Sequence, residues 1–437
     1  MFSRRAAVVT LIAQQEEAEN AVALEAWLEG ITGAIPRGIF DALSGIHTGR
    51  FSYAQMTANY NAKQWAAARC IMADVEPGLK HHELHSLSIH PSSFHLICGL
   101  SFAQFGRLFV SVLPPLRIAF PRCKDTLAPG ELSNAGSRRL KLFLCLYRLK
   151  LAVTFRHIQE TFGWCSSAVS EWFDKVLFIL HVHLKCYHVG FLQMKGMQWQ
   201  HQEVAAWMLK HSQDAQTFRT KVLDQNTKQA ASNPNQPETI NPLTYLAPLG
   251  AVDGTYSVCP AVSAAQLAAY GESAATDRMY TDYKKVHGYK LVALVSFGIT
   301  DGKKYIIYLT HGCARPSDGA VYLVIVPPLK KLVIPQAVFL GDAAFHAAPL
   351  VISPYTALET QGPSAAAAAR KKFNHVHSSD RMVSEHGMRY LKMWGAVRGR
   401  DDCRLFERDD TVLRVFQVVW ALHNYVQDDC PVFTAVL

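Results

Sequence analysis

Residues 287–312 read HGYKLVALVSFGITDGKKYIIYLTHG. Two runs of β-branched and apolar residues flank the dipeptide Asp301-Gly302. A dipeptide of this kind between two apolar runs is a strong hairpin signal, because glycine readily adopts the positive φ that tight turns require. The stretch therefore predicts two strands joined by a short turn.

Further strands are predicted on both sides of the hairpin. YLAPLGAVDG, residues 245–254, reads as a strand that ends in Asp253 and a glycine, and VIPQAVFLGD, residues 333–342, reads as a strand that ends in Asp342. A helical crossover is expected after Asp318, and the chain closes with helices. Strands, then a crossover, a strand and helices predict an α/β fold with a mixed sheet over residues 246–437.

The region before the sheet is predicted to be helical. Residues 1–135 show helical patterns broken by prolines, and the chain start reads as an amphipathic helix rather than a signal peptide. Within 136–190, the stretch TFRHIQETFGWCSSAVSEWFDKVL has the form of a helix-turn-helix, with a turn at Gly163. Residues 191–245 are rich in Gln and Asn and are predicted to be a linker, because such a composition rarely buries a core.

Composition narrows the class of protein. The 437 residues carry a formal charge of +9, which favours a polyanionic partner, and 49% are hydrophobic, enough for substantial cores. Ten cysteines occur without a CxxC pair. This argues against a cysteine zinc module or disulfide framework and fits a reducing compartment. No apolar run reaches about 18 residues without charge or proline, so we expect a soluble protein.

Two histidine-rich stretches lack a recognised set of metal ligands. HHELH at residues 81–85 is not HExxH, and HVHLKCYH at residues 181–188 reads as a helix end. Neither stretch is predicted to bind a metal.

The stretch FNHVHSSDRMVSEHGMRYLK, residues 373–392, predicts an amphipathic helix. At about 100° per residue, its polar face and its apolar face are made by two sets: Arg381, Glu385, Arg389 and Lys392, and Val383, Gly387, Tyr390 and Trp394. Taken alone, Glu385 reads as a surface acid paired with neighbouring arginines, worth a few tenths of a kcal/mol.

Three carboxylates considered together suggest a different role. Asp253 and Asp342 come from predicted strand ends and Glu385 from a predicted helix. Mg²⁺ prefers hard oxygen ligands and is commonly held by a few carboxylates with room for water and phosphate. The three acids therefore predict a divalent-metal site for phosphoryl transfer, flanked by cations that bind a phosphate backbone.

Four blocks, in order, resemble the signature blocks of the PIF/Harbinger superfamily of DDE transposases and of the Harbinger-derived nucleases. They are AVDGTY (251–256), FLGDAAFHAAPLVISPY (339–355), FNHVHSSDRMVSEHGMRYLK (373–392) and VVWALHNYV (418–426). The residues that match within the second and third blocks are Gly341, Asp342, Pro354, Tyr355, Phe373, Asn374, His377, Ser378, Arg381, Glu385, Leu391 and Lys392. The chain departs from the family at Ser384, Met388 and Arg389, where relatives usually have an apolar residue, Phe and Gly, and at Ser317-Asp318, where they often have His-Asp.

The resemblance implies an RNase H-like core with Asp253, Asp342 and Glu385 as catalytic residues that bind two Mg²⁺ (or Mn²⁺) ions. It also implies action in the nucleus on the terminal inverted repeats of a transposon, often with a Myb-like partner protein. A homo-oligomer remains open, and no membrane partner is expected.

DNA contacts are expected from two places. Beside the acids, the candidates are Arg381, Arg389 and Lys392; in the second helix of the helix-turn-helix, they are Ser166, Ser170 and Lys175. That helix carries Glu171 and Asp174 as well, so an upstream basic set is an alternative source of phosphate contacts: Arg138, Arg139, Lys141, Arg148 and Lys150. A purely structural helical pair is the other alternative.

Two other functions remain open at this point. One is a domesticated, non-catalytic DNA- or chromatin-associated protein that keeps the fold as a scaffold. The other is an unrelated two-metal phosphatase or RNase.

Overall fold

The computed structural model describes residues 91–126, 137–162, 165–188, 190–232, 247–261, 263, 268, 277–282, 284–335, 337–346, 348–400 and 409–428. These residues divide into two compact units, one made by the described residues up to Tyr147 with Phe155–Phe173, the other by Arg148–Thr154 and the described residues from Asp174 onward. Most of the predicted region 1–135, including the histidines at 81–85, lies outside the described residues.

The first unit is helical. Its elements are α6 (Pro91–Cys98), α7 (Phe102–Ala119), α9 (Phe155–Phe162) and the beginnings of α8 (Arg138–Leu151) and α10 (Ser166–His183). Aromatic rings form its core, with Phe94 against Phe105 at 5.6 Å and against Phe143 at 5.8 Å between ring centroids. The two helices of the predicted helix-turn-helix are therefore present, while their turn at Gly163 lies outside the described residues.

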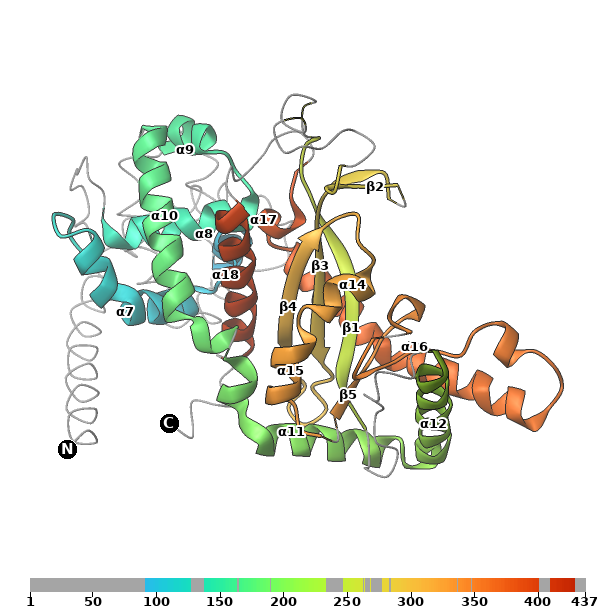
Figure 1. The fold of residues 1–437 in the computed structure, drawn as a ribbon. Coiled ribbons are helices and arrows are strands. Elements are labelled where there is room, and N and C mark those ends of the chain that lie inside the picture. Colours follow the sequence, from blue (N-terminus) through green and yellow to red (C-terminus); the bar gives the residue numbers. More distant parts are fainter. Residues whose placement is uncertain are drawn as a thin grey trace, which may run out of the picture. The chain divides into compact units, whose positions relative to one another are not determined.

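The second unit is built on a mixed sheet (Figure 1). Its strands are β1 (Ala247–Val258), β2 (Tyr280–Thr281), β3 (Val286–Ser296), β4 (Ile306–Cys313), β5 (Ala337–Leu340) and β6 (Val351–Ile352). β1 pairs with β3 in an antiparallel manner and with β5 in a parallel manner, β5 pairs in parallel with β6, and β4 and β2 both pair with β3. The two predicted strands pair as β3 and β4. Residues 297–305 connect them, a longer link than the predicted short turn, and Gly302 within it has φ +72°.

Helices cover both faces of this sheet. The helical elements of the second unit are η2 (Lys185–Tyr187), α11 (Phe191–Lys210), η3 (Ser212–Asp214), α12 (Ala215–Ser232), α14 (Asp318–Leu323), α15 (Val326–Leu332), η4 (Ala343–Phe345), η5 (Leu358–Thr360), α16 (Ala365–Lys392), α17 (Gly395–Arg398) and α18 (Asp409–Asp428). In Figure 1, α14 and α15 lie in front of the sheet and α16 lies behind it, while α11 runs past one end of the strands. The mixed sheet with flanking helices is consistent with the RNase H-like fold that the resemblance implies.

The alternation of side chains along β1 agrees with helices on both faces of the sheet. Ala251 pairs with Val295 and lies two residues before Asp253, so these three side chains share a face of the sheet. Gly387 of α16 packs on Val295, which places that face under α16. Gly254, on the opposite face, contacts Asp318 at the start of α14.

The stretch 191–245 is not an unstructured linker over residues 191–232, where the chain forms α11 and α12. The composition misled because two of its amide side chains, Gln200 and Gln225, are buried and hydrogen-bonded to backbone. Gln200 donates to Leu332 O at 2.9 Å and accepts from Ile334 N at 3.0 Å. Gln225 likewise donates to Val351 O at 2.7 Å and accepts from Ser353 N at 3.3 Å. Each glutamine thus joins a helix to backbone that leads into or out of a strand.

Within the described residues, no helix is both long enough and apolar enough to cross a membrane.

Candidate active site

Asp253 lies within β1 and not at its end, in contrast to the sequence-based prediction. The strand continues to Val258, and Asp253 pairs with Ala293 of β3. Gly254 does not end the strand. A Cβ at this position would lie 2.3 Å from Asp318 Oδ2, so only glycine leaves room for that carboxylate on the other face.

Asp342 lies two residues beyond the end of β5, after Gly341. Its Oδ1 accepts a hydrogen bond from Ala344 N at 2.8 Å, which starts η4 and fixes the side chain. In the parallel pairing of β1 with β5, Ala251 lies opposite Leu340. Asp253 and Asp342 each lie two residues beyond this pair, Asp253 still within β1 and Asp342 past the end of β5.

Glu385 lies on α16, the helix that covers this face of the sheet. The helix begins at Ser364, whose side chain accepts from Ala367 N. It approaches the sheet most closely at Gly387, where a Cβ would lie 2.5 Å from Val295 Cγ2. Glu385 is exposed, with 43% of its side-chain surface accessible.

The predicted apolar face of this helix is only partly buried against the rest of the unit. Val383 and Gly387 are buried, but Tyr390 is 41% exposed and stacks on His423 of α18 at 5.7 Å instead of packing on the sheet. Trp394 is buried beyond the end of α16. Met388, where relatives usually have Phe, is also buried.

Arg381 connects two of the three acids. Its Nη2 lies 3.0 Å from Glu385 Oε1, one helical turn away, and its Nη1 lies 3.7 Å from Asp253 Oδ2. The i,i+4 pair with Glu385 was expected from the helix periodicity. The contact with Asp253 joins α16 to β1 and could not be seen in the sequence.

The electrostatics of Asp253 reflect these neighbours. Its pKa is raised from 3.8 to about 6, chiefly because the side chain is buried. The hydrogen bond from Gly254 N and the charge of Arg381 lower the pKa, whereas the carboxylates of Asp342 and Glu385 raise it. The three acids are therefore close enough to interact through their charges.

As the side chains stand, no group of three or more His, Cys, Asp or Glu residues within the described ranges is arranged to hold a metal ion. The chemistry of Asp253, Asp342 and Glu385 nevertheless suits a divalent cation, because all three offer hard oxygen ligands and their charges interact. Arg381 is at present the cation between Asp253 and Glu385. The donor set fits a divalent ion provided that Arg381 moves.

Several residues of the third block hold α16 in place, a role that the sequence did not indicate. Asn374 accepts from Tyr355 N and donates to Tyr355 O, both at 2.8 Å. His377 Nε2 lies 2.9 Å from Ile352 O. These bonds attach the helix to β6 and to the segment that follows it, and so fix its register against the sheet.

Asp318 belongs to a separate polar group on the opposite face of the sheet. Its Oδ1 lies 2.9 Å from Nζ of buried Lys290, which also donates to Pro316 O. Asp318 is therefore not one of the acids that cluster with Asp253.

The basic candidates differ in accessibility. Arg389 is exposed on α16, and Lys392 is partly buried, which lowers its pKa. In the helix-turn-helix region, Lys175 is exposed while Ser166 and Ser170 are half-buried.

The upstream basic set is largely unsuited to phosphate contacts. Arg138, Lys141 and Arg148 are all buried. Arg138 pairs with Asp125 at 2.6 Å, and Lys141 Nζ lies 3.5 Å from the centre of the Trp172 ring. These cations stabilise the packing of the helices.

The histidines near residues 181–188 pack on one another and on an aromatic ring. The rings of His181 and His188 stack at 5.2 Å, and His188 lies 5.8 Å from Trp420. Burial lowers the pKa of His188 to about 4.

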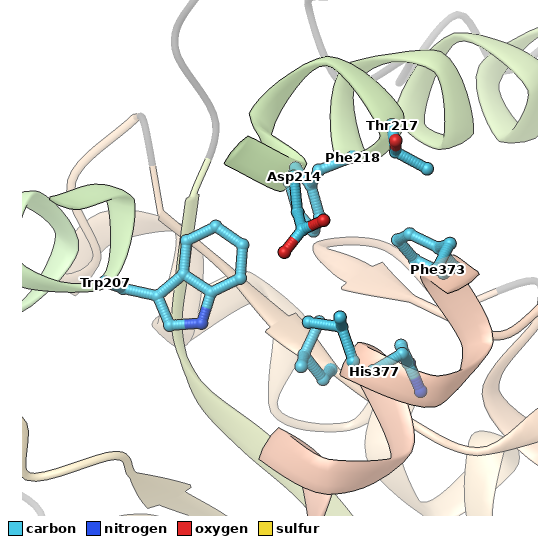
Figure 2. Close-up of a pocket in the computed structure, with 8 residues that line it drawn as sticks. Trp207, Asp214, Thr217, Phe218, Phe373 and His377 are labelled. Atoms are coloured by element: carbon cyan, nitrogen blue, oxygen red, sulfur yellow. The ribbon is translucent and has the colours of Figure 1, made fainter. Parts of the chain in front are cut away.

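A cavity beneath α16 is too small to bind a substrate. Figure 2 shows Trp207 of α11, Phe218 of α12 and Phe373 of α16 around it. Its volume is about 10 Å³, about the least that one water needs. It belongs to the aromatic packing that joins these helices.

Comparisons with known proteins bear on the segment that carries the acids. No curated protein matches the chain, and no solved structure matches it. Residues 252–424, which include Asp253, Asp342 and Glu385, match the family model of the DDE superfamily endonucleases.

Proposed function

We propose that this chain is a metal-dependent DNA endonuclease of the PIF/Harbinger type, which cuts and joins phosphodiester bonds at transposon ends. One observation carries the proposal. Asp253 lies in β1, Asp342 lies two residues beyond the end of the neighbouring parallel strand β5, and their charges interact. Glu385 on the overlying helix interacts with Asp253 through its charge and through the shared Arg381. These acids lie in the segment that matches the DDE endonuclease family model.

Each acid has a defined part in this proposal. Asp253, Asp342 and Glu385 would hold Mg²⁺ or Mn²⁺, two ions in all. Bound divalent ions supply activation of an attacking oxygen and stabilisation of a leaving one. The protein contributes rigidity, because Asp253 is fixed in β1 by the ladder with β3, and Asp342 by its bond to Ala344 N.

The cations near the acids would bind the substrate. Arg381, Arg389 and Lys392 project from the same helix as Glu385 and can offer charge to phosphates beside the scissile bond. Ser166, Ser170 and Lys175 of α10 are the proposed second contact with DNA. Terminal inverted repeats as substrate, a Myb-like partner and action in the nucleus complete the proposal on the strength of the family resemblance.

The experiment compares Asp253 of β1 with Asp318 of α14, which lie on opposite faces of the sheet. The full chain is incubated with labelled duplex DNA carrying candidate terminal repeats and with nonspecific duplex, each with Mn²⁺. Asp253→Asn should abolish cleavage. Asp318→Asn changes an acid that does not cluster with Asp253, so this variant should keep most of the cleavage activity.

Absence of cleavage by the parent protein on every DNA would refute the catalytic function and favour the non-catalytic scaffold. Cleavage that survives in Asp253→Asn would refute the assignment of the site.

A further inference from the structure

The cation between the candidate metal ligands is the side chain of Arg381. Its guanidinium reaches Glu385 Oε1 at 3.0 Å with one nitrogen and Asp253 Oδ2 at 3.7 Å with the other. The side chain is only 20% exposed, so it lies between helix and strand rather than in solvent. One arginine thus contacts an acid of β1 and an acid of α16 at the same time.

A divalent ion would need the same carboxylates at much shorter range. Mg²⁺ binds oxygen at about 2.0–2.1 Å and tolerates little distortion. The guanidinium of Arg381 contacts the two acids at ordinary ion-pair distances. A divalent ion placed between the same acids would be repelled by the positive charge of that guanidinium. Arg381 and a divalent ion bound to both acids therefore compete for one position.

The contacts of Arg381 are weak enough to be exchanged. Glu385 is 43% exposed, and an i,i+4 pair in such a setting contributes little. The contact with Asp253 is near the upper limit for an ion pair. Displacing the guanidinium therefore costs little, and its long stem allows the head to turn to another anion.

We propose that Arg381 is a positioning residue that occupies the place of the divalent cation, keeping Asp253 and Glu385 together until a divalent ion displaces its guanidinium. The inference rests on the proposed function. The released guanidinium then meets the anion closest to the acids, the DNA phosphodiester, whose oxygens suit its planar fork. Arg381 thereby couples metal binding to DNA binding.

The test measures metal affinity directly, without DNA. Mn²⁺ is titrated into the full chain by calorimetry at about pH 8, so that protonation of Asp253, whose pKa is about 6, does not limit binding. Arg381→Gln should bind Mn²⁺ about 3- to 5-fold more tightly than the parent, as expected for the loss of a weak competing ion pair. Arg381→Lys, which keeps the positive charge, should bind Mn²⁺ with nearly the affinity of the parent.

A matched control is Arg156→Gln. Arg156 forms the same kind of i,i+4 pair, with Glu160 at 2.8 Å, in the other compact unit of the chain. Its removal should leave the affinity for Mn²⁺ unchanged.

Thermal melting provides a second readout that a misfolded variant would not reproduce. Without metal, Arg381→Gln should melt below the parent, because Asp253 and Glu385 lose their shared cation. With saturating Mn²⁺ the difference in melting temperature between Arg381→Gln and the parent should disappear. A variant that was merely damaged would melt lower in both conditions, and this result would overturn the inference.

The two proposals fail in different ways. If the parent binds Mn²⁺ and Arg381→Gln binds it equally or more weakly, the inference about Arg381 is wrong and the metal-dependent function stands. If neither parent nor variant binds Mn²⁺, both are wrong.

Discussion

Asp253→Asn should stabilise the metal-free protein at neutral pH. A carboxyl whose pKa is raised from 3.8 to about 6 costs the folded state about 3 kcal/mol once it is ionised, at about 1.4 kcal/mol for each pH unit. This shift already includes the lowering of the pKa by the hydrogen bond from Gly254 N and by the charge of Arg381. We therefore expect Asp253→Asn to gain up to about 3 kcal/mol.

The sign of the pH dependence follows from the direction of the shift. Because the folded state binds the proton of Asp253 more tightly than the unfolded state does, stability falls as the pH rises from about 4 to about 6. The variant lacks this titration. Its advantage should be close to zero below about pH 3, where Asp253 is neutral in both states, and almost complete at about pH 7.

Urea unfolding with a chelator present, followed at several pH values, measures the difference. The values below about pH 3 serve as an internal control, since they compare two neutral side chains of similar size. If Asp253→Asn is no more stable than the parent at about pH 7, or if its advantage does not change with pH, the account of a buried and crowded carboxylate is incorrect.

Further predictions concern the helix that carries Glu385. Gly387→Ala should destabilise the protein by about 1–3 kcal/mol in urea unfolding, because its Cβ would lie 2.5 Å from Val295, whereas Gly106→Ala in α7, with open space around it, should be neutral or stabilising by up to about 1 kcal/mol. Asn374→Ala should cost about 1–3 kcal/mol, because it leaves the backbone N–H and C=O of Tyr355 without these hydrogen bonds; an unchanged unfolding midpoint would contradict the proposed anchoring.

The sequence predicted the elements of the sheet better than their limits. The hairpin of β3 and β4 followed from Asp301-Gly302, and the crossover after Asp318 is present as α14 and α15. Gly254 was misread as a strand end. A glycine stands there because a larger residue would collide with the carboxylate of Asp318 on the opposite face. A contact of this kind depends on tertiary structure and leaves no local pattern.

The same limit applies to the helices before the sheet and to the acids. Local composition could not reveal that Gln200 and Gln225 would each satisfy two buried backbone groups. Helical periodicity predicted that Arg381 would meet Glu385, but only the packing of α16 on β1 brings it to Asp253. The assignment of the three acids as catalytic residues remains a prediction.

The anchoring of α16 sets a limit on how this chain can vary in length. Asn374 is fixed to Tyr355, and Glu385 follows on the same uninterrupted helix. One residue inserted between them would turn Glu385 by about 100° and move it by about 1.5 Å, away from Asp253. Even seven inserted residues, which nearly restore the angle, would shift it by about 10 Å. Evolution can lengthen the loops of this protein, but the spacing between these two residues of α16 can neither grow nor shrink while the acid stays in place.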